Sequence, residues 1–282
     1  MKGPTKTLIP CLLLLATIVI QYPAATKALE VEFSYIEGSE KGPSRWGDLK
    51  PEWAACKNGT SQSPIDLWSR RMRVVSNSSD DLNNGYKPAT ASILNRGRDI
   101  QVSWQADAGS ATINGTQLFL QEAHWHWPSE HIINGKRYAL ELHMVHQATQ
   151  PDGSNKTAVV TALYRLGRPD PFLSMLEESI KEIREEGEEK SVGVIDPSEI
   201  GLSRGHRYYR YIGSLTAPPC TQGVIWTISN KLRTVSREQL NLLVNSVQYY
   251  AKRNARPLQP LHSREIQLYV PNASNNINTP HY

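Results

Sequence analysis

Residues 111–127, "ATINGTQLFLQEAHWHW", hold two runs of strand-forming residues on either side of Asn114-Gly115. Asn-Gly pairs favour tight hairpin turns because both residues tolerate a positive φ. Residues 132–146, "IINGKRYALELHMVH", repeat the pattern around Asn134-Gly135. The two stretches predict neighbouring antiparallel strands in the middle of the chain.

Other segments extend this sheet and add a few helices. Alternating or continuous apolar runs predict strands over residues 99–104, 157–166 and 223–228. Residues 171–190 and 236–250 place apolar side chains at helical intervals instead. The expected apolar faces are Phe172, Leu176, Ile180 and Ile183 in the first helix, and Leu240, Leu243, Val244 and Val247 in the second. We therefore expect a mainly β protein, a single domain around a large, mostly antiparallel central sheet with a few peripheral helices.

Residues 1–28 differ in composition from the rest of the chain. Lys2 and Lys6 precede an apolar run from Leu8 to Ile20, and small residues follow at 24–28. This order predicts a signal peptide that is cleaved from the mature protein. The apolar run is too short to span a bilayer comfortably, which disfavours the alternative of an uncleaved anchor. We expect no stable membrane anchor.

A signal peptide implies entry into the secretory pathway, with the cell exterior as the expected destination and a vacuole or a plastid as alternatives. The remainder is expected to form one domain over residues 29–270 and a flexible polar tail over 271–282. Without residues 1–28 the formal charge falls from +4 to +1, because that segment has three lysines and no acids. No basic cluster indicates a nucleic-acid partner.

The cysteines and the N-x-S/T triplets fit an oxidising compartment. Cys11 lies in the predicted signal peptide, which leaves Cys56 and Cys220. An even pair in such a compartment predicts one disulfide bond, with two free thiols as the alternative. The glycosylation candidates are Asn58, Asn77, Asn114, Asn155 and Asn272. We expect a glycoprotein that carries sugar at some of them.

Three histidines lie on the two central strands. Residues i and i+2 of a strand point to the same face, so Glu122, His124 and His126 share one face of the first strand. Glu141 and His143 share a face of the next strand in the same way. Each glutamate can accept a hydrogen bond from a histidine two residues away, which would fix the tautomer of a metal ligand.

The turn Asn134-Gly135 sets the expected register of these strands. In a two-residue hairpin loop Ile133 pairs with Lys136, and counting outwards places His126 opposite His143. Cross-strand neighbours have Cβ atoms about 4.5–5.5 Å apart, so three imidazoles could converge. Three neutral histidines with one open position are the arrangement of a catalytic zinc site.

A simpler interpretation of these histidines has to be weighed. A lone H-x-H pair is more often a surface or core feature than a metal site, so the third histidine carries the zinc hypothesis. His131 and His146, which lie close to the three, are expected to be hydrogen-bonded structural residues.

Longer motifs occur in order along nearly the whole mature chain. They are "FSYIEGSEKGPSRWGDLKPEWAAC" (33–56), "SQSPIDL" (61–67), "LNRGRDI" (94–100), "HWHWPSEH" (124–131), "ALELHMVH" (139–146), "GSLTAPPCTQGVIWTI" (213–228) and "NARPLQP" (254–260). With these motifs the chain resembles the α-class carbonic anhydrases, and more narrowly the plant secreted branch that includes nectarins and dioscorins. The resemblance implies the α-carbonic anhydrase fold for residues 29–270. It also implies reversible hydration of carbon dioxide to bicarbonate and a proton by zinc-bound hydroxide.

The resemblance implies roles for individual residues. The Zn²⁺ ligands are expected at His124, His126 and His143. Glu141 corresponds to the carboxylate behind the third ligand, and Thr216 to the threonine that accepts a hydrogen bond from the hydroxide, with Glu130 as the acid behind it. The apolar wall for carbon dioxide is expected at Val145, Val159, Leu215, Val224 and Trp226. Cys56 and Cys220 stand where secreted members carry a disulfide.

The departures from the family pattern concern the surroundings of the metal. Arg98 occupies the position of the proton-shuttle histidine, and an arginine stays protonated and cannot relay a proton. Arg96 replaces a small polar residue next to it. Glu122 replaces a glutamine and is expected to raise the pKa of the zinc water, and Ala217 replaces a threonine. We therefore expect an active enzyme that is slowed by proton export.

Two other classes of function stay open. The dioscorin resemblance allows a weakly active or inactive storage or defence protein on the same fold. A zinc-retaining module that binds a carbohydrate or a protein is a third class, although no residue supports it directly. The presence of all three ligand histidines favours the enzyme. Its expected partners are carbon dioxide and bicarbonate, and the expected assembly is a monomer or a dimer.

Overall fold

A computed structural model describes residues 31–68, 70, 72–77, 83–151, 153–202 and 206–271, together with Gly3. The description below concerns the unit that begins at Glu32. Apart from Gly3 and Pro271, the predicted signal peptide and the predicted polar tail, including Asn272, lie outside the described residues. Both therefore stay predictions, as do the exact domain boundaries.

Strands make up most of the regular secondary structure in the described chain. They are β1 (Asp66–Leu67), β2 (Met72–Asn77), β3 (Asn83–Tyr86), β4 (Ala89–Asn95), β5 (Ile100–Trp104), β6 (Gly109–Ile113), β7 (Thr116–His126), β8 (Ile132–Ile133), β9 (Lys136–Arg137), β10 (Leu140–Thr149), β11 (Asn155–Leu166), β12 (Glu189–Ile195), β13 (Tyr208–Ser214), β14 (Gln222–Ser229), β15 (Arg233–Val235) and β16 (Ile266–Pro271). The α-helices are α1 (Trp46–Leu49), α2 (Ala55–Asn58), α3 (Pro171–Glu182) and α4 (Arg237–Ser246). Short 3-10 helices are η1 (Pro43–Arg45), η2 (Pro51–Trp53), η4 (Pro197–Ile200) and η5 (Tyr249–Ala251).

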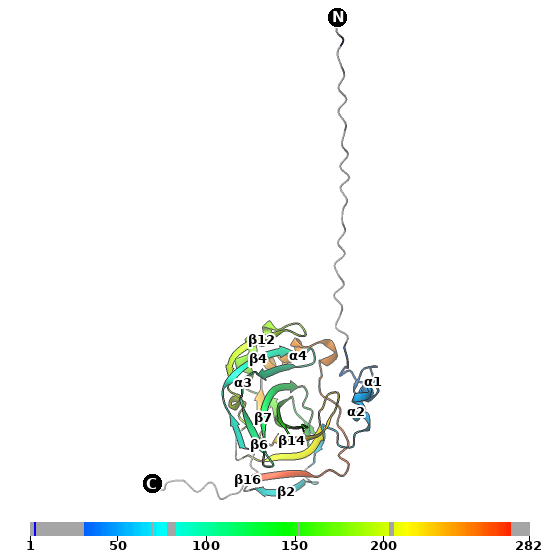
Figure 1. Ribbon diagram of the computed structural model, residues 1–282, viewed down its shortest axis with the longest axis vertical. Helices are drawn as coiled ribbons and strands as arrows, with labels where there is room; N and C mark the ends of the chain where they lie inside the picture. Colours follow the sequence, from blue (N-terminus) through cyan, green and yellow to red (C-terminus); the bar gives the residue numbers. More distant parts are fainter. Residues whose placement is uncertain are drawn as a thin grey trace, which may run out of the picture. The chain divides into compact units, whose positions relative to one another are not determined.

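Thirteen strands form one large mixed sheet, in the main order β12-β4-β5-β7-β10-β11-β14-β13-β16-β2. Neighbouring pairs along this order are antiparallel except for β11 with β14 and β16 with β2. Figure 1 shows α1 and α2 on one flank of this sheet, and α3 beside β12 and β4 on another. The predicted mainly β fold with a large central sheet and peripheral helices is confirmed.

Both Asn-Gly turns form as the sequence predicts. Asn114 and Gly115 adopt φ values of 49° and 72°, and Ile113 pairs with Thr116 across the turn. Asn134 and Gly135 adopt 50° and 77° between β8 and β9. Positive φ at both central residues gives the turn a twist that matches the flanking strands.

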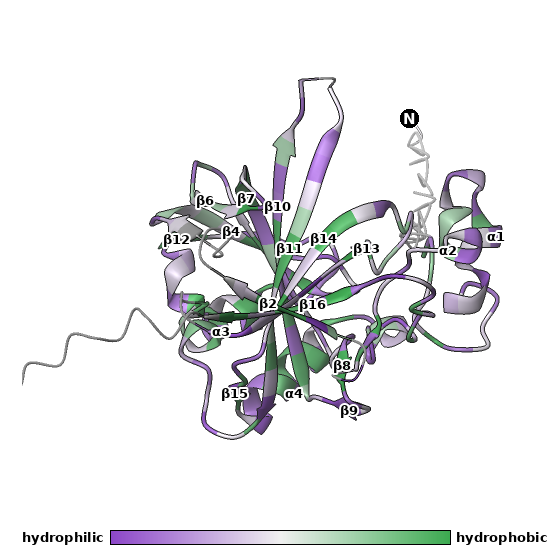
Figure 2. Cartoon of the chain, turned by 90° about the horizontal axis from the view of Figure 1, so that it is seen from below, coloured by the Kyte–Doolittle hydropathy of each residue, from purple (hydrophilic) through white to green (hydrophobic). Residues whose placement is uncertain are grey.

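The central strands also form where the apolar runs predict them. β11 is buried continuously from Ala158 to Tyr164, since β10 and β14 flank it on either side and both of its faces are covered. Figure 2 shows β10, β11 and β14 next to one another, as the pairing requires. This sheet provides the rigid frame for the site described below.

The helix predicted over residues 171–190 is shorter than expected. α3 ends at Glu182, and Glu189 already begins β12. The backbone leaves the helical conformation at Ile183, which has φ −93° and ψ 81°. In the turn that follows, the Glu188 carboxylate accepts hydrogen bonds from the Arg184 and Glu185 backbone N–H groups, and Gly187 has a φ of +90°. The turn was not predicted from the sequence, because its charged residues are also typical of a helix surface. The second helix begins as expected, with Ser236 in a capping box.

The disulfide between Cys56 and Cys220 is present, which confirms the predicted pairing. It joins α2 to the loop after β13 across 164 residues of sequence. No helix among the described residues is long and apolar enough to span a membrane.

Candidate active site

The three predicted histidines meet at one point of the β7–β10 ladder. His124 lies opposite His143, and His126 lies opposite Glu141. The expected pairing of His126 with His143 is therefore wrong by two residues. A shift by an even number of residues keeps every side chain on its face, which is why the histidines still converge.

The register shift arises between the predicted turn and the histidines. Ile133 pairs with Lys136 as expected, but β8 and β9 belong to a separate small sheet with β1. Residues 127–131 connect β7 to β8, whereas only residues 138–139 connect β9 to β10. Because these connections differ in length, the register of the hairpin is not transmitted to the long strands. Pro128, which has no N–H to donate, lies in the longer one.

The histidine rings pack closely around a common centre. Their ring centroids are separated by 5.0 Å for His124 and His126, 5.2 Å for His124 and His143, and 4.6 Å for His126 and His143. One nitrogen of each ring lies within 4.8 Å of the corresponding nitrogens of the other two. A single cation could therefore reach all three.

Each histidine is oriented by a protein group on the side away from this centre. Nδ1 of His124 lies 2.9 Å and 3.0 Å from the two carboxylate oxygens of Glu122. Nδ1 of His126 donates to the backbone carbonyl of Asn254 at 2.8 Å, and Nε2 of His143 donates to Oε1 of Glu141 at 2.7 Å. The nitrogens left to face the centre are Nε2 of His124, Nε2 of His126 and Nδ1 of His143.

The chemistry of this donor set fits a zinc ion. Burial lowers the pKa of His126 and of His143 to about 4, so both rings are neutral at physiological pH. Nε2 of His126 is buried without a hydrogen-bond partner, which would be costly unless another group, such as a cation, contacts it. Three neutral imidazoles that leave a fourth position open are typical of catalytic zinc.

Glu141 belongs to a longer buried network. Its Oε1 accepts from Nδ1 of His131 at 2.7 Å as well as from His143. Nε2 of His131 accepts from the Tyr211 hydroxyl at 2.7 Å, and that hydroxyl lies 2.7 Å from Oγ of Ser63. Burial alone would raise the pKa of Glu141, but the bonds from the two histidines hold it well below its usual range. His131 thus has the hydrogen-bonded environment that its sequence context suggested.

Glu130 and Thr216 lie together beside the histidines. Glu130 is fully buried, and its Oε1 accepts from the Arg256 backbone N–H at 2.9 Å. Its Oε2 lies 3.7 Å from Nε2 of His126. Burial raises the pKa of Glu130, and the nearby Thr216 side chain is among the groups that lower it. Oε2 of Glu130 is buried without a hydrogen-bond partner among the described residues. Glu130 and Thr216 are 86 positions apart in the sequence, and the fold brings them close together.

The histidines form the base of a cavity of about 250 Å³. Four of the five apolar residues expected for the carbon dioxide wall line it, namely Val145, Val159, Leu215 and Trp226. The fifth, Val224, is buried in the hydrophobic cluster behind them and is not among the lining residues. Val224 shares a face of β14 with Trp226, and Trp226 is the residue of that strand that lines the cavity. The expected place of Val224 in the wall stays a prediction.

The mouth of the cavity is charged. Arg96 donates to Asp99 with a distance of 2.6 Å between Nε and Oδ1, and Nε of Arg98 lies 3.5 Å from Oδ2 of the same carboxylate. Arg98 also lies over the ring of Phe33, with 5.7 Å between Cζ and the ring centroid. Burial would raise the pKa of Asp99, but the two guanidiniums hold it well below its usual range. Two guanidiniums and one ionised carboxylate therefore line this part of the cavity.

Sequence reasoning missed three residues that support the site. Asn254 positions His126 through its carbonyl and holds the backbone N–H of Trp127 through Oδ1 at 2.8 Å. Arg256 anchors Glu130, and Tyr35 lines the cavity. Asn254 and Arg256 lie in the motif "NARPLQP", which carried the family resemblance but no assigned role. A backbone carbonyl has no sequence signal of its own.

Comparison with known proteins agrees with this geometry. The family model of the eukaryotic-type carbonic anhydrases matches residues 41–270. "Alpha carbonic anhydrase 7" of Arabidopsis thaliana is 49% identical over 90% of this chain and 92% of its own. "Carbonic anhydrase Nec1" of Nesocodon mauritianus is 48% identical over 91% of this chain and 93% of its own. The crystal structure of dioscorin complexed with ascorbate superposes with a TM-score of 0.81 at 43% identity, and covers 86% of this chain and 100% of that one.

The family match spans most of the chain, and the matched region contains the histidine centre, Glu130, Thr216 and every cavity-lining residue except Tyr35. The chain therefore belongs to the eukaryotic-type carbonic anhydrase family, and it is a lyase of the carbonate dehydratase type.

Proposed function

We propose that this protein hydrates carbon dioxide reversibly to bicarbonate and a proton, with Zn²⁺ held by Nε2 of His124, Nε2 of His126 and Nδ1 of His143. The observation that carries the proposal is the convergence of three imidazole nitrogens whose opposite nitrogens are already hydrogen-bonded. When bound there, zinc would lower the pKa of a coordinated water and so supply a nucleophile at neutral pH.

The protein groups behind the ligands would set both geometry and charge. Neutral imidazoles would leave the full charge on the metal. Glu122 and Glu141 place carboxylates behind two of these ligands, where they contact His124 and His143 and not the metal. Asn254 contributes a neutral carbonyl to the remaining ligand. We expect Glu122 to orient His124 firmly and to raise the pKa of the zinc water.

Thr216 and Glu130 would orient the attacking oxygen. A threonine hydroxyl that donates its proton to a buried carboxylate can only accept from another group. The attacking oxygen would then have to donate to Thr216, which turns its lone pair toward carbon dioxide. The backbone N–H of Thr216 would face the developing bicarbonate oxygen.

The apolar wall would hold the substrate against the nucleophile. The side chains of Val145, Val159 and Leu215 have no hydrogen-bonding group, and Nε1 of Trp226 already donates to the Ser214 carbonyl at 3.0 Å. A molecule without a dipole therefore competes well with water there. Val159 and Trp226 are paired neighbours on β11 and β14, which makes the wall rigid.

Proton export is the step that we expect to be slow. Arg98 lines the cavity at the position that the resemblance assigns to a shuttle group. Its Nε lies 3.5 Å from Oδ2 of Asp99, and arginine side chains do not release a proton at working pH. Protons would then leave through water and external buffer.

The proposed setting is the secretory pathway, with the cell exterior as its end point. The Cys56–Cys220 disulfide fits that pathway. Among the sequons, Asn58, Asn114 and Asn155 have exposed side chains on the described surface, so an attached sugar would meet no core packing. The side chain of Asn77 lies outside the described residues.

The test is to measure zinc content and carbon dioxide hydration on the purified protein, before and after treatment with a zinc chelator. We expect about one zinc per chain and hydration that the chelator abolishes and added zinc restores. Zinc without chelator-sensitive hydration would contradict the proposal and favour the storage or defence alternative.

A further inference from the structure

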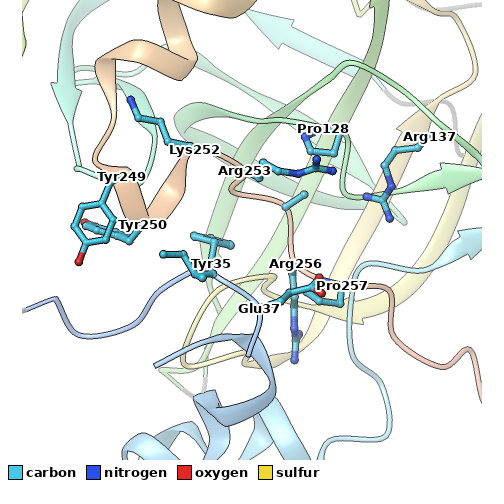
Figure 3. Close-up of a pocket in the computed structure, with 12 residues that line it drawn as sticks. Tyr35, Glu37, Pro128, Arg137, Tyr249, Tyr250, Lys252, Arg253, Arg256 and Pro257 are labelled. Atoms are coloured by element: carbon cyan, nitrogen blue, oxygen red, sulfur yellow. The ribbon is translucent and has the colours of Figure 1, made fainter. Parts of the chain in front are cut away.

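A second cavity of about 540 Å³ lies next to the proposed active site. It is bounded by the N-terminal segment around Tyr35, by η5, by residues 252–257, and by Pro128 and Arg137 (Figure 3). Its size is in the usual range for small-molecule sites. Nothing in the proposed reaction uses it.

The charges around this cavity are mostly positive. Four cations line it, against the single acid Glu37. Two of the cations are already engaged. Lys252 donates to the Val244 carbonyl at the end of α4 at 2.8 Å. The buried Arg256 donates to Gln62 and to two backbone carbonyls.

The other two cations are available to a ligand. Arg253 is exposed and has no hydrogen bond or ion pair with any described residue. Among the described residues, the Arg137 side chain forms one hydrogen bond, from Nη1 to the Ser129 carbonyl at 2.5 Å, so most of its five N–H groups have no partner there. Figure 3 shows both guanidiniums on the Pro128 side of the cavity, and Glu37 forms no ion pair with either of them in the described part of the chain.

The remaining walls are apolar or aromatic. Tyr249 is 73% exposed and Ile36 is 44% exposed, which is unusual for large side chains of this kind. Pro128 and Pro257 complete the apolar lining. Figure 3 shows Tyr249 and Tyr250 at the end of the cavity opposite the two arginines.

We propose that this cavity binds a small organic acid, with its carboxylate on Arg253 and Arg137 and its hydrocarbon body against Tyr249 and the prolines. The planar fork of a guanidinium matches a carboxylate in a bidentate arrangement. The apolar walls favour a ligand with a hydrocarbon body, which an inorganic anion lacks. The binding does not depend on the proposed zinc chemistry.

The cavity shares two structural parts with the active site. Tyr35 lines both cavities. Arg253 and Ala255 line the second cavity, whereas Asn254 between them faces the other way and holds His126. A ligand here would therefore lie directly behind the support of a proposed metal ligand.

The test uses benzoate as the probe, titrated calorimetrically into the full zinc-loaded protein in low-salt buffer. Arg253→Ser is expected to weaken benzoate binding by at least about tenfold, because a charge-assisted hydrogen bond is lost. Arg137→Gln should weaken it similarly, and Arg253→Lys should fall between Arg253→Ser and the parent protein. The matched control is Arg168→Gln, at an exposed position that lines neither cavity, and it should leave binding unchanged.

Since Arg253 has no partner among the residues that the structure describes, its replacement should leave the melting temperature unchanged, which checks folding. Benzoate can also reach a metal, so the variants decide where it binds. Absence of benzoate binding, or equal binding by the parent, Arg253→Ser and Arg137→Gln proteins, would overturn the proposal. Inorganic phosphate that binds as tightly as benzoate would overturn the assignment to an organic acid.

Discussion

The base and the mouth of the active-site cavity are held in different ways. At the base, His126, His143, Glu130 and Glu141 are each at most 2% exposed. At the mouth, the Arg98 side chain is 33% exposed and its nearest acidic partner is 3.5 Å away. The base is therefore held by buried hydrogen bonds and tolerates few substitutions. At the mouth, the partly exposed Arg98 side chain can be replaced without disturbing the fold.

The largest effect is expected from His143→Ala at the base. Removing one ligand should reduce zinc affinity by more than the roughly 10–100-fold that loss of a supporting group costs, and hydration should fall with it. Metal analysis after dialysis and a stopped-flow assay measure both. His206→Ala, at an exposed histidine that does not line the cavity, is the control. Full zinc content in His143→Ala would show that the third ligand is misassigned.

Thr216→Val separates chemistry from metal binding. Valine keeps the shape of the threonine side chain but lacks the hydroxyl, so it cannot donate to Glu130 or accept a hydrogen bond from the attacking oxygen. We expect kcat/KM for hydration to fall about 100-fold, as is typical when a reacting group loses its alignment, with zinc content unchanged. A zinc-loaded variant with the parent rate would remove Thr216 from the mechanism.

The two supporting carboxylates should differ from each other. Glu141→Gln disturbs His143 and His131 together, whereas Glu122→Gln disturbs only His124. We expect zinc affinity to fall by about 10–100-fold for Glu141→Gln and by less for Glu122→Gln. Competition with a chelator of known affinity measures this. Equal losses would mean that the buried network beyond Glu141 contributes nothing to the metal site.

The smallest effect is expected at the mouth. Arg98→His places a group that can take up and release protons at the cavity entrance. Turnover in dilute buffer should rise by about tenfold, below the 10²–10⁴-fold range of positioned proton transfer, and the gain should vanish in concentrated buffer. Arg98→Gln is the matched control, because it removes the charge without adding a titrating group. An unchanged turnover for Arg98→His in dilute buffer would contradict the shuttle explanation.

Local patterns predicted much of the fold because they depend on near neighbours in the chain. The Asn-Gly turns, the period-two strands and the capping box at Ser236 all formed where expected. The helix over 171–190 failed near its end, because its glutamates and lysines suit a turn as well as a helix surface. In the structure, the non-helical backbone at Ile183 and the positive φ at Gly187 distinguish the turn from a helix.

The metal site was predictable for a related reason. Side chains alternate strictly between the two faces of a strand, so the sequence places His124 and His126 on one face whatever the register of β7 with its neighbours. The precise pairing with β10 was wrong by two residues, and the side chains still converged. Asn254 could not be predicted, because it acts through a backbone carbonyl that any residue would offer.

By itself, the sequence determined which residue types share a face, where the turns fall, and which cysteines remain to form a disulfide. The shared faces follow from the alternation of side chains along a strand, the turns from the backbone preferences of Asn and Gly, and the disulfide from the oxidising compartment that the signal peptide predicts. Only the tertiary structure decided that Asn254 and Arg256 support a site on β7 and that Val224 is buried in the hydrophobic cluster. The same holds for the second cavity, where Arg253 has no partner in the described part of the chain. Contacts between segments more than a hundred residues apart depend on how the whole sheet packs, and no local pattern encodes them.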